Sequence, residues 1–139
     1  MDAVSEVQAL LDCRVEACRA KDIDRLMSLY ADECVYFDVV PPLQFTGSSA
    51  IRRNFVRWFD EYAGRIGLET SDLHVVVNGE VAFAHMLHGD RGNRNLPDSG
   101  VWLRSTVCCQ RTQKRWLITH EHISLPIDKS GMVVIDLEP

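Results

Sequence analysis

The 139-residue sequence lacks the segments that mark secreted, membrane-spanning and nucleic-acid-binding proteins. Its first residues, MDAVSEVQALLDC, include acidic side chains and have neither a basic start nor a long apolar run, so we expect no signal peptide. No apolar stretch approaches the length of a transmembrane helix. Lys and Arg number 15 against 20 Asp and Glu, with no basic block, which argues against nucleic acid and anionic membranes as partners.

Cysteine pairs with metal-binding spacing are also missing. The five cysteines form no Cys-x-x-Cys motif, and Cys108 and Cys109 are adjacent, so on a strand they point to opposite faces. We therefore expect reduced thiols in a cytoplasmic protein. Gly-x-Ser-x-Gly, P-loop and Rossmann glycine patterns are absent, so neither a serine nucleophile nor a nucleotide cofactor is indicated.

The composition that remains is that of one ordinary globular domain. Apolar residues make up 46% of the chain and charged residues 25%, and no repeat or low-complexity tract interrupts it. Residues 1–139 are therefore expected to form a single domain with its own core.

Helical periodicity dominates the first part of the chain. Apolar residues recur at three- to four-residue spacing over residues 4–18, and further helices are predicted over residues 23–30 and 48–62. Between them, residues 34–39 are rich in β-branched and aromatic side chains and predict a strand.

The second part of the chain reads as antiparallel strands. They are predicted over residues 73–77, 81–88, 101–111 and 116–125. Residues 89–100 are predicted to form a polar loop, and a lid is one role open to it. Three N-terminal helices followed by strands predict an α+β fold, in which the helices pack on a curved, mainly antiparallel sheet. The resulting cone-shaped interior would suit a small-molecule pocket.

Several stretches, taken in order, carry a family pattern. They are DIDRLMSLYADE (22–33) with VYFD (35–38), GSSAIR (47–52), WLRST (102–106) and WLITHEHISLP (116–126). Together they resemble the SnoaL-like, ketosteroid-isomerase-like branch of the nuclear transport factor 2-like superfamily. The resemblance implies a cone-shaped (cystatin-like) α+β fold, usually a homodimer packed through the sheet. Members include isomerases, dehydratases, cyclases, epoxide hydrolases and non-catalytic modules, so the fold does not decide the function.

Strand alternation predicts which side chains meet in the cone. We expect the faces bearing Tyr36 with Asp38, Trp102 with Arg104, and His120 with His122 to point inward. The predicted catalytic residues are Asp38, His120 and Arg104, and the predicted ligand-binding residues are Tyr36, Trp102, Thr106, His122 and Trp58.

The resemblance assigns a role to each catalytic candidate. Asp38 falls where ketosteroid isomerases place their proton-shuttling aspartate, which implies a general base. The isomerases' oxyanion donors, a tyrosine and an aspartate, correspond here to Arg14 and Thr106, which argues against steroid isomerisation. Arg104 would stabilise an anion instead, and His120 would act as an acid or orienting residue.

Structural alternatives to these roles stay open. Asp38 and Arg104 can form a buried ion pair, and either of His120 and His122 can be a hydrogen-bonded core histidine. The two histidines could also share a metal ion with Asp38 or His85, but two histidines without spaced acids are a weak metal signal. We expect no metal and no cofactor.

The leading interpretation is a protein that binds a small organic molecule and is an acid/base enzyme of the isomerase, dehydratase or cyclase type. Its substrate would be a small, partly apolar carbonyl or carboxylate compound. The alternative is a non-catalytic dimeric module for ligand binding or protein interaction, with the pocket plugged by a tryptophan or the tail. A homodimer through the sheet is expected from apolar positions assigned to its outer face, namely Val101, Leu103, Val107, Leu117 and Ile123.

Overall fold

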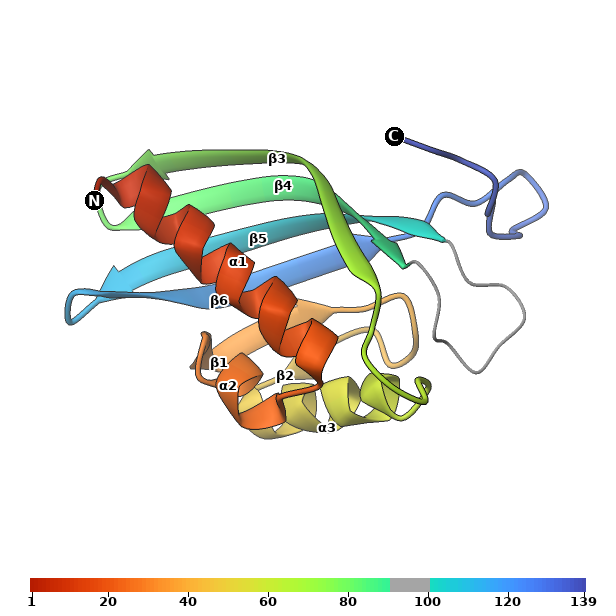
Figure 1. Cartoon of the computed structure of the whole chain (residues 1–139), viewed down its shortest axis with the longest axis horizontal. Helices are drawn as coiled ribbons and strands as arrows, with labels where there is room; N and C mark the ends of the chain where they lie inside the picture. Colours follow the sequence, from red (N-terminus) through yellow and green to blue (C-terminus); the bar gives the residue numbers. More distant parts are fainter. Residues whose placement is uncertain (91–100) are drawn as a thin grey trace.

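The computed structural model describes residues 1–90 and 101–139 as three helices on one face of a six-stranded sheet (Figure 1). The helices are α1 (Ala3–Ala20), α2 (Ile23–Met27) and α3 (Ser48–Phe59). The strands are β1 (Tyr30–Phe37), β2 (Phe45–Thr46), β3 (Leu68–Asn78), β4 (Val81–Asp90), β5 (Trp102–Thr112) and β6 (Arg115–Ser124). The predicted α+β architecture is confirmed.

The strand order is β2-β1-β6-β5-β4-β3, and only β1 and β6 run parallel. This order sets the first strand of the sequence beside the last one, so strands far apart in the chain are neighbours within the sheet. Figure 1 shows α1 lying across the sheet while α2 and α3 sit below β1 and β2.

Local capping explains where the first two helices begin and end. The side chain of Asp2 accepts a hydrogen bond from the Ser5 amide at 2.8 Å, and Lys21 ends α1 in the left-handed conformation with φ 54°. Asp22 then caps α2 through the Arg25 amide at 3.2 Å. Helix α2 is shorter than the sequence predicts because Tyr30 pairs with β6 instead of continuing the helix.

The helices bury one side against the sheet. The buried residues of α1 are Val7, Leu10, Leu11, Arg14, Ala17 and Cys18, which follow the helical period. Arg14 is the one charged residue in this stripe, and the amphipathic pattern therefore carries its side chain into the interior. Helix α3 contributes Ile51, Phe55 and Phe59 from below.

Two strand predictions differ from the structure. Strand β3 begins at Leu68 rather than residue 73, and β2 was not predicted because a two-residue strand has no pattern to detect. Gly89 and Asp90 belong to β4, and the remainder of the predicted loop lies outside the described residues.

A β-bulge in β6 reverses the alternation of its side chains. Cys108 of β5 pairs with His120, whereas Cys109 pairs with Ile118, so Thr119 has no partner across the ladder. One extra residue moves every later side chain to the other face of the sheet. Ile118 is therefore buried inside the cone, and His120, two residues later, is not.

The inner and outer faces can now be assigned. After the bulge, Glu121 and Ile123 face inward and His122 faces outward. On β5 the inward side chains are Leu103, Ser105, Val107 and Cys109. The sequence predicts the opposite face of β5, with Trp102 and Arg104, to point inward, because both faces of this strand carry apolar residues. Of the five positions predicted to form an outer dimer face, all but Leu117 thus lie inside the cone, namely Val101, Leu103, Val107 and Ile123.

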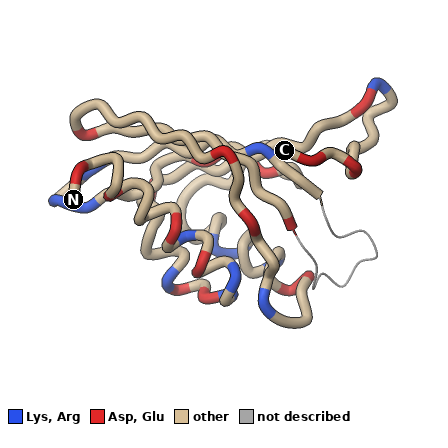
Figure 2. Tube along the Cα trace, turned by 45° about the horizontal axis from the view of Figure 1, so that its top comes forward, with Lys and Arg blue, Asp and Glu red and all other residues tan. Residues whose placement is uncertain are grey.

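Charged residues of both signs are intermixed along the helices, as Figure 2 shows, and do not gather into a block of one sign. Across the two described ranges, no helix has both the length and the apolar character needed to cross a membrane.

Candidate functional site

A cavity of about 350 Å³ opens between the concave face of the sheet, α1, α3 and the C-terminal segment. Most of its wall is apolar and includes Phe55, Trp58, Leu68, Leu103 and Ile123. A few polar groups converge on this wall, which is the usual composition of a small-molecule site. Trp58 and the tail line the cavity and leave it hollow, so neither plugs it.

The inner end of the cavity is built on a buried ion pair. Arg14 Nη1 donates to Glu121 Oε2 at 2.5 Å, and the Tyr30 hydroxyl donates to Glu121 Oε1 at 2.6 Å. Burial alone would lower the pKa of the Arg14 guanidinium, but the Glu121 carboxylate outweighs burial and raises it. Burial and the same carboxylate raise the pKa of Tyr30, so the phenol stays protonated.

His88 from β4 extends this network in one defined tautomer. Its Nε2 lies 2.9 Å from Arg14 Nη2, and an arginine has only donors, so Nε2 accepts. In the neutral ring Nδ1 then carries the proton and donates to Thr70 Oγ1 at 3.0 Å. Burial, together with the nearby Arg14 charge, lowers the pKa of His88 to about 3. His88 is therefore neutral at physiological pH.

Asp38 lies just after β1, lines the same cavity and is less deeply buried than Glu121. Its side chain is 10% exposed, and Oδ1 and Oδ2 accept hydrogen bonds of 2.6 Å from the Val39 amide and the Asn54 side chain. Arg57 Nη2 lies 3.9 Å from Oδ2. Because all three neighbours are donors, they hold the Asp38 carboxylate in a defined orientation in which its oxygens can accept a proton.

Tyr36 precedes Asp38 on the same face of the chain and lines the same cavity. Among the described residues its hydroxyl has no hydrogen-bond partner, although the side chain is buried. Burial, followed by the charges of Glu121 and Asp38, raises the pKa of Tyr36 well above that of a free tyrosine. The hydroxyl is therefore a protonated donor available to a ligand. Burial likewise raises the pKa of Cys18 to about 12, which makes this lining thiol a poor nucleophile.

The structure brings together three of the eight predicted site residues. Asp38, Tyr36 and Trp58 line the cavity. The other five, Trp102, Arg104, Thr106, His120 and His122, lie outside it. The physical reasons are the bulge at Thr119 in β6 and the choice of the wrong face of β5.

His120 and His122, which were predicted to line the cavity, pack against other residues on the outer face of the sheet. Phe37 lies between them, with ring centroids 4.7 Å from His120 and 5.2 Å from His122. His120 Nδ1 is 2.6 Å from the carbonyl oxygen of Val35, so it donates to this strand where the register between β1 and β6 shifts. His120 thus fills an irregularity in the sheet.

The remaining misplaced residues also differ from their predicted roles. Arg104 donates to Ser124 Oγ at 3.1 Å on the exposed side and forms no ion pair with Asp38. Trp102 lies against Gly89 of β4, where an added Cβ would come within 2.7 Å of the indole. Within residues 1–90 and 101–139, no group of three or more His, Cys, Asp or Glu side chains is arranged to hold a metal ion.

Glu121 and His88 are not among the site residues predicted from the sequence, and the family resemblance places Arg14 only where isomerases have a tyrosine. A signal existed for Arg14, which interrupts an otherwise apolar helical stripe. Glu121 and His88 lie in strands whose two faces look alike, and their link to Arg14 spans 107 and 74 residues of sequence.

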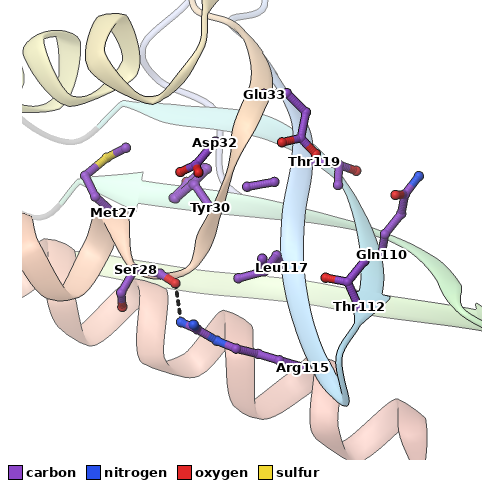
Figure 3. Close-up of a pocket in the computed structure, with 11 residues that line it drawn as sticks. Met27, Ser28, Tyr30, Asp32, Glu33, Gln110, Thr112, Arg115, Leu117 and Thr119 are labelled. Carbon is purple, nitrogen blue, oxygen red and sulfur yellow. Dashed lines mark hydrogen bonds between the residues drawn. The ribbon is translucent and has the colours of Figure 1, made fainter.

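A second concavity of about 400 Å³ lies at the junction of α2, β1, β5 and β6 (Figure 3). Its lining is polar and includes the exposed side chains of Asp32 and Glu33 and that of Arg115, which donates to the carbonyl oxygen of Ser28. This depression lacks an enclosing apolar wall, so the cavity with Asp38 is the candidate site.

The helices and the sheet form a cone-shaped α+β domain around an interior cavity. The chain belongs to the SnoaL-like domain family, whose model matches residues 7–128. It is similar to a nuclear transport factor 2-like protein of unknown function from Pseudomonas putida, with 32% identity and a TM-score of 0.90. The match covers 99% of this chain and 96% of that chain.

Two more distant solved structures share the fold. A candidate dehydratase from Streptomyces avermitilis has 20% identity and a TM-score of 0.79, with 90% of this chain and 96% of that chain covered. A ketosteroid isomerase-like protein from Erwinia carotovora atroseptica has 12% identity and a TM-score of 0.71, with 88% and 95% covered. No curated protein sequence matches the chain.

The buried ion pair predicts a non-additive effect on stability. Arg14→Met or Glu121→Leu alone leaves an uncompensated buried charge and should lower the free energy of unfolding by about 3–5 kcal/mol. The double variant removes both charges and should be more stable than either single variant. Urea unfolding of the four proteins measures this coupling, and simple addition of the two losses would contradict it.

The lowered pKa of His88 predicts acid sensitivity. Because the unfolded chain has a histidine pKa near 6.5 and the folded chain one of about 3, the unfolded state binds more protons between these values. Stability should therefore fall as the pH falls through this window. His88→Gln should remove up to about 1.4 kcal/mol per pH unit of this dependence in urea unfolding. The exposed His74→Gln variant is the control, and a His88→Gln profile parallel to wild type would contradict the prediction.

Proposed function

We propose that the protein binds a small, mostly apolar carbonyl compound in the cavity and moves a proton on it. Asp38 is the general base that removes a proton from the carbon next to the carbonyl group. The Tyr36 hydroxyl donates a hydrogen bond to the carbonyl oxygen, where negative charge develops. Trp58 supplies part of the apolar wall. This step is common to isomerases, dehydratases and cyclases that work without a cofactor.

One observation carries the proposal. An oriented carboxylate, Asp38, and a protonated hydroxyl without a protein partner, Tyr36, line the same largely apolar cavity. The apolar wall weakens competition from water and strengthens both interactions. The names of two solved relatives, a candidate dehydratase and a ketosteroid isomerase-like protein, support the same class of chemistry.

Glu121 is a poorer choice for the base. Its carboxylate is bound directly to the Arg14 guanidinium at 2.5 Å, and its side chain is only 3% exposed. A proton arriving at Glu121 would break the buried ion pair, which is costly. Asp38 has no such close cation, because Arg57 stands 3.9 Å away.

The proposal predicts catalysed exchange of hydrogen for deuterium next to a carbonyl. We expect wild type to accelerate exchange in D₂O for members of a panel of bicyclic ketones that includes 2-tetralone, followed by proton NMR. Asp38→Asn should reduce the catalysed rate by at least about 100-fold. Tyr36→Phe should reduce it by about 100-fold, because the oxygen loses its donor.

His122→Ala is the matched control, since His122 lies on the outer face. Its rate should equal that of wild type. Ligand binding with no exchange above the Asp38→Asn level across the panel would contradict the enzyme and favour the alternative, a non-catalytic ligand-binding module.

We also infer that two copies pair through the outer face of the sheet. The dimer face differs from the one read off the sequence. Val76 and Phe83 are 39% and 47% exposed and lie directly opposite one another on β3 and β4, and Phe83 is also opposite Cys108. Exposed apolar side chains grouped on a sheet face favour a protein partner. The odd number of cysteines fits a reducing compartment, and we place this dimer in the cytoplasm.

The dimer is tested with Phe83→Glu, which places a charge in the centre of the proposed contact. Light scattering after size exclusion at micromolar concentration should show a wild-type dimer and a monomeric variant. Val56→Glu, at a comparably exposed apolar site on α3, should remain dimeric. A monomeric wild type would contradict the inference.

A further inference from the structure

The segment after β6 is folded by a turn of its own. The carboxylate of Asp128 accepts hydrogen bonds from the Ser130 amide at 2.8 Å, the Ser130 hydroxyl at 2.6 Å and the Met132 amide at 3.1 Å. These bonds, first among them the one from the Ser130 side chain, lower the pKa of Asp128. Gly131 has φ 87°, a conformation that suits glycine at this point of the turn.

Backbone hydrogen bonds close the turn into a small hairpin. The amide of Asp128 donates to the Met132 carbonyl and the amide of Val134 to the Pro126 carbonyl, both at 2.9 Å. Ile127 and Val133 form an antiparallel bridge between them. These bonds fold the segment on itself and do not tie it to the sheet.

This hairpin brings two aliphatic side chains to the cavity. Val133 and Ile135 line it, and they remain 40% and 49% exposed. Figure 1 shows the C-terminal segment beyond the ends of β5 and β6. The cavity wall is thus completed by a part of the chain that belongs neither to the sheet nor to the helices.

The exposed area of these side chains is unfavourable in water and would be covered by an apolar ligand. Neighbouring Met132 and Leu137 are also exposed, at 66% and 48%, but do not line the cavity. We therefore expect a ligand in the cavity to contact Val133 and Ile135 and not Met132 or Leu137.

We infer that residues 126–139 form a strap that closes over the ligand, with Val133 and Ile135 selecting an apolar end of the molecule and slowing its release. The inference rests on the proposed ligand-binding function and adds its specificity-determining residues. Asp128 is a positioning residue, because its carboxylate holds the turn that directs the strap and does not itself line the cavity.

The test uses the neutral, apolar fluorophore N-phenyl-1-naphthylamine as the ligand. Val133→Ser/Ile135→Ser should raise its Kd about tenfold and increase its dissociation rate, because apolar contact area is lost. Met132→Ser/Leu137→Ser is the matched control and should stay within about twofold of wild type. Trp58→Ala, which alters the part of the wall contributed by α3, should weaken binding and so locate the dye in the cavity.

Proteolysis gives a second readout. Lys129, in the exposed turn, is the only Lys or Arg after Arg115, so trypsin cleavage there releases residues 130–139. Saturating dye should slow this cleavage in wild type and in the control variant. It should have little effect in Val133→Ser/Ile135→Ser, because the strap no longer grips the ligand.

The outcomes separate this inference from the function on which it rests. If wild type and Trp58→Ala differ in dye binding while Val133→Ser/Ile135→Ser behaves like its control, the strap is overturned and the cavity stands. If wild type binds no dye, both are overturned. Dye binding that depends on the strap but not on Trp58 would place the dye on the surface and would overturn the strap.

Discussion

The guanidinium of Arg14 and the carboxylate of Glu121 meet at the centre of the cone, and they join elements that the chain order keeps apart. Arg14 comes from α1 and Glu121 from β6, while Tyr30 of β1 and His88 of β4 complete the network. Each charge would be costly without the other in this buried setting, so the helix can settle on the sheet in only one register. The same contacts hold β1 beside β6, where the register shifts, and thereby fix the position of the chain that leads to Asp38.

This network also explains why Glu121 and His88 can line the cavity without being its reactive groups. Glu121 is held by two donors, and His88 is held neutral between Arg14 and Thr70. Their hydrogen-bonding capacity is used within the protein. Tyr36 and Asp38 line the same cavity, where the Asp38 carboxylate is oriented by the backbone amide of Val39 and the side-chain amide of Asn54. We therefore assign the Arg14–Glu121 network to structure, and Tyr36 and Asp38 to the proposed chemistry.

The sequence predicted the fold well because its signals are local. Helical period, capping residues and the Asn78-Gly79 turn all act within a few positions, and the elements they predict are present. The site was predicted less well because it depends on the parity of strands. Thr119 adds one residue to β6, so Glu121 and not His120 lies on the inner face. The amino-acid composition of the strand does not indicate this insertion. Asp38 and Tyr36 escaped this error because the register shift of β1 lies between Tyr30 and Val35, so the alternation is regular where these two residues stand, and Trp58 lies on a helix.

The charges around the cavity also bear on the kind of molecule it accepts. Among the described lining residues there are two cations: Arg14 is bound to Glu121, and Arg57 lies 3.3 Å from Glu61 as well as near Asp38. A carboxylate ligand would have to displace one of these partners while facing Asp38, and like charges in an apolar enclosure repel strongly. A neutral carbonyl meets no such obstacle, because it needs only the hydroxyl of Tyr36 and the apolar wall. Of the two substrate types compatible with the sequence, the arrangement of charge thus favours the uncharged one.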